Sequence, residues 1–113
     1  MLGVKERGIL SNIVEHCIRI EETISGLEKD DFDKSKDIQD VVCFNIFQIG
    51  ALSKHLSPDF IAEYHAVPWQ SIKGMRDIIG HGYGTIDMIR VWKTATQDIQ
   101  PLKIYCQSIL KNN

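Results

Sequence analysis

The sequence has no long apolar run and no excess of positive charge. No stretch approaches the ~18 apolar residues that a membrane-spanning helix needs, so we expect no membrane span. The charged start, MLGVKERGIL, lacks the apolar core of a secretory signal, and we expect a cytoplasmic protein. The formal net charge is −2, whereas a protein that coats nucleic acid normally carries a basic surplus. Any nucleic acid would have to be held by a local group of side chains.

Cysteine is scarce, and its spacing excludes two common roles. The three cysteines are far apart, odd in number and without a C-x-x-C pair: Cys17, Cys43 and Cys106. A disulfide framework and a zinc finger both need pairs, so we interpret these residues as small core side chains. The sequence also contains no glycine-rich phosphate loop, nucleophile elbow or paired-carboxylate pattern. We therefore expect neither a metal ion nor another cofactor.

Strand-like alternation, internal repeats and low-complexity linkers are also absent. Instead, apolar residues recur every three or four positions over 10–27, 38–56, 69–79 and 89–109, which is typical of helices. Ser57-Pro58 predicts the start of a further short helix, because the hydroxyl can cap it and proline loses no hydrogen bond in the first turn. We predict an all-α protein, an antiparallel four- to five-helix bundle in which residues 1–113 form a single domain.

Several details of the bundle follow from single residues. Lys29-Asp30-Asp31 predicts a polar turn, and Pro101 should kink or split the last helix because its ring removes a backbone hydrogen bond. Asn45 lies among apolar residues and should form hydrogen bonds inside the bundle. The apolar stripes predict that Val41, Phe44, Ile46, Phe47 and Ile89 are buried. Trp69 and Trp92, which lie on the same stripes, are expected to be core or interface anchors.

The stretch GMRDIIGHGYG, residues 74–84, brings chemically active side chains to the glycine-rich end of a predicted helix. On an unbroken helix Arg76 and His81 would point about 140° apart. Gly80 and Gly82 permit backbone angles that end a helix. His81 can therefore turn back beside the long side chain of Arg76.

An arginine and a histidine that converge can cleave RNA without a metal ion. The planar cation of Arg76 fits a phosphate, and His81 can give and take protons near neutral pH. The ribose 2′-hydroxyl would attack the neighbouring phosphorus while the arginine stabilises the developing charge. Asp77 could orient either partner, and the phenol of Tyr83 could accept a transferred group. An ordinary ion pair and a helix cap are the alternative interpretation of the same residues.

Residues 68–92, PWQSIKGMRDIIGHGYGTIDMIRVW, resemble the signature region of the HEPN superfamily, specifically the HepT-like ribonuclease toxin family. The R-x4-H-x-Y motif of that family is matched by Arg76, Asp77, His81 and Tyr83. Upstream, the residues that resemble the family's second helix are Asp40-Val41-Val42, Asn45 and Ile49-Gly50. The chain differs at Ala51, where the family often has an acidic residue, and at Gly84, where it often has an aromatic one.

The resemblance implies a function and two partners. Arg76 and His81 would be the catalytic pair of a metal-independent endoribonuclease toxin, with Asp77 in support. The bundle would form a homodimer through its motif helices, which doubles Arg76, Lys73 and Arg90 in one cleft. The antitoxin would be a minimal nucleotidyltransferase that transfers AMP to Tyr83. The modification would inhibit the nuclease, because added bulk and negative charge beside the arginine repel an RNA phosphate.

Two other functions remain open at the level of sequence. The chain could be a non-catalytic HEPN module that binds a nucleotide or phosphate and docks a nucleotidyltransferase. It could also be a structural helical dimer in which the motif only closes a turn.

Overall fold

The protein is helical throughout the part of the chain that the structure describes. This computed structural model describes residues 2–80 and 86–113, and no strand occurs in them. The helices are α1 (Val4–Ile24), α2 (Lys29–Lys34), α3 (Lys36–Ser53), α4 (Pro58–Glu63), α5 (Trp69–Gly80), α6 (Met88–Lys93) and α7 (Ile99–Lys111), with a π-helical turn, η1 (Thr94–Asp98), between the last two. None of these helices combines the length and apolarity that crossing a bilayer requires. The prediction of an all-α protein is confirmed.

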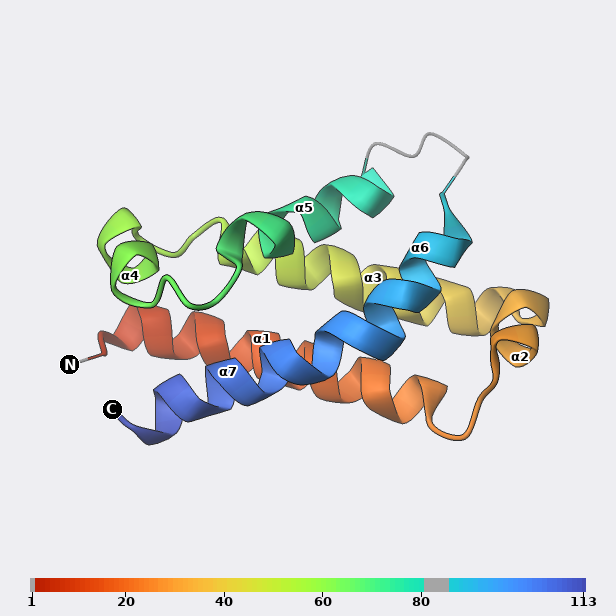
Figure 1. The fold of residues 1–113 in the computed structure, drawn as a ribbon, viewed down its shortest axis with the longest axis horizontal. Helices are drawn as coiled ribbons and strands as arrows, with labels where there is room; N and C mark the ends of the chain where they lie inside the picture. Colours follow the sequence, from red (N-terminus) through yellow and green to blue (C-terminus); the bar gives the residue numbers. More distant parts are fainter. Residues whose placement is uncertain (1, 81–85) are drawn as a thin grey trace.

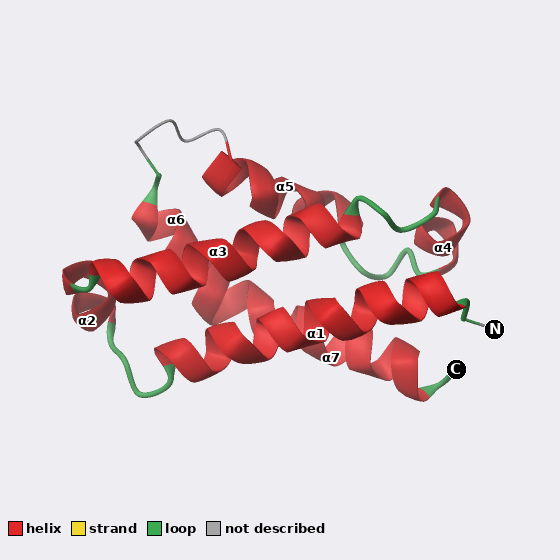
Figure 2. Ribbon diagram, turned by 180° about the vertical axis from the view of Figure 1, so that it is seen from behind, coloured by secondary structure: helices red, strands yellow, loops and turns green. Residues whose placement is uncertain are grey.

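The long helices run alternately in opposite directions (Figure 1). α3 packs against both α1 and α5, and α7 packs against α1. Seen from behind, α1 and α3 lie side by side, with the short α2 at one end of the bundle and the short α4 at the other (Figure 2). This arrangement is the predicted antiparallel bundle of four long helical segments, extended by two short helices.

The core consists of the predicted helical stripes. The fully buried side chains include Leu10, Ile13, Cys17 and Ile20 of α1, Val42, Ile46 and Ile49 of α3, and Ile99 and Cys106 of α7. Burial raises the pKa of Cys17 and of Cys106 to about 12. Both thiols therefore stay protonated at neutral pH and pack as apolar groups, which confirms their interpretation as core residues.

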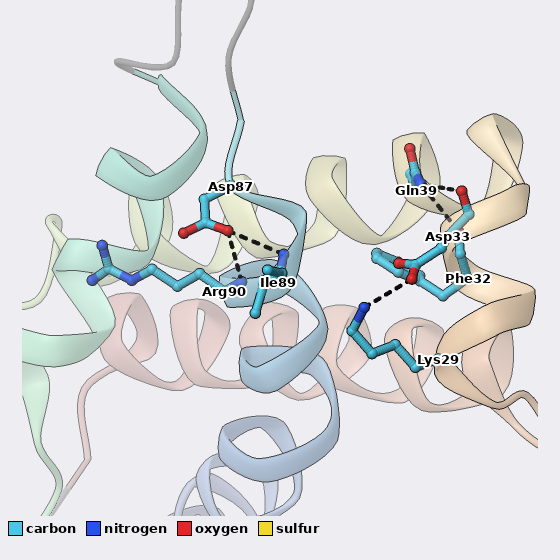
Figure 3. A network of polar contacts seen from close by, with 7 residues as sticks. All are labelled: Lys29, Phe32, Asp33, Gln39, Asp87, Ile89 and Arg90. Atoms are coloured by element: carbon cyan, nitrogen blue, oxygen red, sulfur yellow. Dashed lines mark hydrogen bonds and ion pairs between the residues drawn. The ribbon is translucent and has the colours of Figure 1, made fainter.

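The predicted polar turn at residues 29–31 is wrong, because these residues begin α2. The Asp31 carboxylate accepts a hydrogen bond from the backbone N–H of Glu28 at 2.9 Å, and acidic residues in a first turn favour a helix. Phe32 is completely buried, and its ring centroid lies 5.0 Å from that of Trp92. Gln39 of α3 donates to the Phe32 carbonyl oxygen at 3.0 Å (Figure 3). The buried ring and this hydrogen bond hold α2 against the bundle.

The last helix is split, as predicted, but the split shifts its apolar stripe. The π-helical turn η1 precedes Pro101, which lies in the first turn of α7. A π turn contains one extra residue, so the stripe of α7 does not continue in phase into α6. Ile89 was expected in the core and is 69% exposed, whereas Val91 is completely buried. The prediction for Ile89 is therefore wrong.

The apolar surface of α3 is only partly covered. Ile46 is buried and Phe47 is half-buried, but Val41 is 44% and Phe44 is 53% exposed. Burial of these last two was predicted and is wrong, because α1 and α5 cover only part of the circumference of α3.

Asn45 forms the hydrogen bonds expected of a polar residue inside the bundle. Its side-chain nitrogen donates to the Val41 carbonyl oxygen at 2.8 Å, and its side-chain oxygen lies 2.7 Å from Nδ1 of His16 on α1. The side chain is 2% exposed. Because unpaired polar groups are costly to bury, these contacts specify how α1 and α3 pair.

Gly50 allows α5 to approach α3 very closely. A Cβ atom at position 50 would lie 2.6 Å from the backbone nitrogen of Arg76 and 2.7 Å from its Cβ. Trp69, Ile72 and Met75 are buried along α5, and the Trp69 indole nitrogen donates to the Tyr64 carbonyl oxygen at 3.0 Å. A glycine in mid-helix normally costs about 1 kcal/mol, and here it makes room for the neighbouring backbone.

Replacing Phe32 with alanine should destabilise the protein by about 3–5 kcal/mol, because it leaves a cavity in a fully buried site. The matched control is Phe44→Ala on α3, which should cost about 1 kcal/mol because only about half of that side chain is buried. Urea unfolding followed by circular dichroism measures both variants. Equal stabilities of the two variants would contradict the placement of α2.

Replacing Gly50 with alanine should destabilise the protein by about 1–3 kcal/mol, because the added methyl group overlaps the Arg76 backbone. Gly8→Ala is the control, since a Cβ at Gly8 meets nothing within 4 Å. That change should stabilise α1 by up to about 1 kcal/mol. A Gly50→Ala protein as stable as Gly8→Ala would show that α3 and α5 do not meet here.

Candidate active site

Arg76 is held against α3. Its side chain is half-buried, and its Cζ atom lies 5.4 Å from the centroid of the Phe47 ring. A guanidinium at this distance from an aromatic face is attracted by the ring quadrupole, by about 0.5–1 kcal/mol at a partly exposed site. Gly50, which is also on α3, contacts the backbone of Arg76. α3 therefore limits where the arginine can go, as a site for an anionic phosphate requires.

The remaining motif residues divide into two groups. His81 and Tyr83 lie outside the described residues, so their convergence with Arg76 stays a prediction. Asp77 is exposed on α5, and its supporting role also stays a prediction. The structure thus places the arginine of the predicted catalytic pair and not the histidine.

The start of α6 is fixed just beyond the motif. The Asp87 carboxylate accepts hydrogen bonds from the backbone N–H groups of Ile89 at 3.1 Å and Arg90 at 3.3 Å. From this first turn of α6 the Arg90 side chain extends toward α5 (Figure 3). The motif is therefore attached in sequence to α5 on one side and to a capped α6 on the other.

Positive charge lies on both helices that adjoin the motif. Lys73 of α5 is half-buried, and Arg90 and Lys93 of α6 are exposed. The ion pairs found between described residues are Lys29–Asp33, Lys36–Asp40 and Lys103–Glu21, so none of these three cations forms an ion pair with a described carboxylate. The local surplus agrees with the expectation that a chain of net charge −2 would bind RNA only locally.

Two positioning residues were not foreseen as such from the sequence. The apolar stripe predicts only that Phe47 is a core residue. The packing of α5 on α3 shows that the Arg76 guanidinium lies over its ring. Gly50 did carry a signal, since a glycine inside a helix often marks a close approach of two backbones. Lys93 was also overlooked, although it lies one turn from Arg90.

Among the described side chains, no group of three His, Cys, Asp or Glu residues is arranged to hold a metal ion.

Comparison with known proteins assigns the chain to a family. The family model described as "Ribonuclease HepT-like" matches residues 13–109, which include α3, α5 and the whole R-x4-H-x-Y motif. No solved structure gives a significant match.

Curated relatives are similar over most of this chain. A protein of Methanocaldococcus jannaschii named "Gamma-glutamylcyclotransferase and putative RNase" is 36% identical over 90% of the chain, which spans only 45% of that longer relative. A "Putative RNase" of Caldanaerobacter subterraneus subsp. tengcongensis is 29% identical over 93% of the chain and 94% of its own length. A "Probable ribonuclease HepT" of Thermococcus cleftensis is 34% identical over 83% of the chain and 86% of its own length. The family match and these relatives show that the chain belongs to the HepT-like ribonuclease family.

Proposed function

We propose that this protein is a metal-independent endoribonuclease that cleaves RNA with Arg76 and His81. The observation that carries the proposal is the complete R-x4-H-x-Y motif inside the family match. The packing of Arg76 against Gly50 and Phe47 of α3 supports it. A guanidinium whose position is fixed in advance binds a substrate phosphate in one defined geometry.

The proposed reaction needs only proton transfer and charge stabilisation. The ribose 2′-oxygen attacks the adjacent phosphorus, a new P–O2′ bond forms, and the P–O5′ bond breaks. The 2′-hydroxyl loses one proton and the leaving 5′-oxygen gains one, and His81 takes part in this exchange. Arg76 stabilises the additional negative charge on the phosphoryl oxygens in the transition state. The products carry a 2′,3′-cyclic phosphate and a 5′-hydroxyl.

A homodimer through the motif helices would complete the cleft. Two chains would bring two copies of Arg76, Lys73 and Arg90 together, and the structure leaves Arg90 exposed and unpaired among the described residues. With two copies of His81, one imidazole could accept the 2′-hydroxyl proton while the other protonates the leaving oxygen.

We further propose that the nuclease is the toxin of a toxin–antitoxin pair. Its antitoxin would be a minimal nucleotidyltransferase that adds AMP to Tyr83. The added phosphate would lie within seven residues of Arg76 in the sequence, where its negative charge would compete with RNA for the guanidinium.

Purified protein should cleave RNA in the presence of EDTA, and His81→Ala should reduce the rate about 10²–10⁴-fold, because the proton transfer loses its catalyst. The products, resolved by denaturing electrophoresis, should end in 2′,3′-cyclic phosphate. His55→Ala is the matched control. His55 is exposed in the turn that follows α3, so this variant should cleave at the wild-type rate.

Full activity of a folded His81→Ala protein would contradict the catalytic role of the histidine. Wild-type protein that binds nucleotide and cuts no RNA would instead favour the non-catalytic HEPN module. A rate per chain that falls on dilution would support the dimeric cleft, and a constant rate down to concentrations where the protein is monomeric would refute it.

Tyr83→Phe should cleave RNA normally and resist inactivation by the partner nucleotidyltransferase with ATP, because it lacks the acceptor oxygen. Intact-mass spectrometry measures the added AMP. Tyr64→Phe serves as the control and should be modified like the wild type. AMP on the Tyr83→Phe protein would place the modification elsewhere.

A further inference from the structure

A groove separates α5 from the segment formed by α6, η1 and α7. Its volume is about 750 Å³, within the range of sites that hold small ligands. Buried Ile72, Met75 and Leu102 contribute to its floor. Arg76 contacts α3 on the other flank of α5, so its guanidinium is not part of the groove lining.

One end of the groove is positively charged. Arg90 and Lys93 are one helical turn apart on α6, which places them on the same face. Neither belongs to an ion pair of the described residues. Asp98 also lines the groove, further along toward α7. The end nearer the start of α6 therefore carries two cations that form no ion pair with a described carboxylate, while the Asp87 carboxylate caps the backbone of the same turn.

The other linings suit nucleotides. Gln70 of α5 and Gln97 of η1 offer neutral amides, which can form hydrogen bonds with base edges. Tyr105 of α7, which is 43% exposed, presents an aromatic ring at the far end. Cations followed by an accessible aromatic ring are the usual combination for binding single-stranded nucleic acid.

Gly74 keeps the middle of the groove open. It lines the groove from α5, and a Cβ at this position would meet nothing within 4 Å. A larger side chain at position 74 would therefore extend into free space without disturbing the bundle.

We propose that this groove binds the stretch of single-stranded RNA that adjoins the scissile phosphate. Arg90 and Lys93 contact its backbone phosphates, and Tyr105 stacks on a base. One wall of the groove is α5, the helix that also carries Arg76, and the other is the segment of α6, η1 and α7 that follows the motif in the sequence. The two walls lie next to each other in Figure 1. The inference rests on the proposed ribonuclease function for its substrate.

Gly74→Glu tests the groove by adding bulk and negative charge to it. For this variant the ratio of kcat/KM for an RNA of roughly eight nucleotides to kcat/KM for a dinucleotide should fall about tenfold, the effect of losing one contact to a charged group. Gly8→Glu makes the same change in α1, where a side chain also has free space, and should leave the ratio unaltered. Thermal unfolding confirms that both variants are folded.

A second measurement does not depend on cleavage. The probe is a fluorescent 2′-O-methyl RNA of the same length, which lacks the attacking hydroxyl, and its binding is followed by anisotropy at several salt concentrations. In Lys93→Gln, which removes a groove cation that is not assigned to the proposed dimer cleft, the slope of log K against log[salt] should decrease by about 0.7. The control Lys34→Gln removes one exposed lysine that does not line the groove and should keep the wild-type slope.

The outcomes separate the two proposals. A reduced slope in a protein that cuts no RNA would support the groove and refute the nuclease. An unchanged slope and an unchanged length ratio, in a protein that does cut RNA, would overturn the groove. If Gly74→Glu blocked a partner protein and altered neither RNA measurement, the groove would be a protein-binding surface and the inference would be wrong.

Discussion

The contact between α5 and α3 at Gly50 is the constraint on which the candidate site depends. No Cβ can be accommodated at this position without overlapping the backbone of Arg76. The same approach places the Arg76 guanidinium over Phe47, so one helix sets both the backbone position and the side-chain environment of the arginine. Because one flank of α5 packs closely against α3, the opposite flank of α5 is left to line the groove toward α7.

The distribution of polar groups explains how a slightly acidic chain can belong to a ribonuclease family. The interior is apolar, with protonated thiols and the Asn45–His16 contact as one of its few polar features. Lys29 and Lys36 are paired with nearby carboxylates, while Arg90 and Lys93 are not paired within the described residues. Net charge averages over the whole surface, whereas a phosphate senses mainly the charges within about 8 Å at physiological ionic strength.

Sequence reasoning was most reliable where one residue type has one physical use. The Ser57-Pro58 start of α4, the hydrogen-bonded Asn45 and the interruption before Pro101 were all predicted correctly. It failed where a local pattern permits two answers. The acidic segment that became α2 can form a turn or a first helical turn, and the buried Phe32 decides between them. The phase error at Ile89 arose because a π turn leaves no simple mark in an apolar periodicity.

The sequence by itself determined the helical class, the antiparallel bundle, the core stripes and the family motif, because periodicity, caps and motif spacing are local properties of the chain. Tertiary structure alone decided that Phe47 lies beneath a cation, that Val41 and Phe44 stay exposed, and that a groove opens between α5 and α7. These features depend on the distances between helices. Such distances result from the packing of side chains that are remote in sequence, which no local pattern specifies.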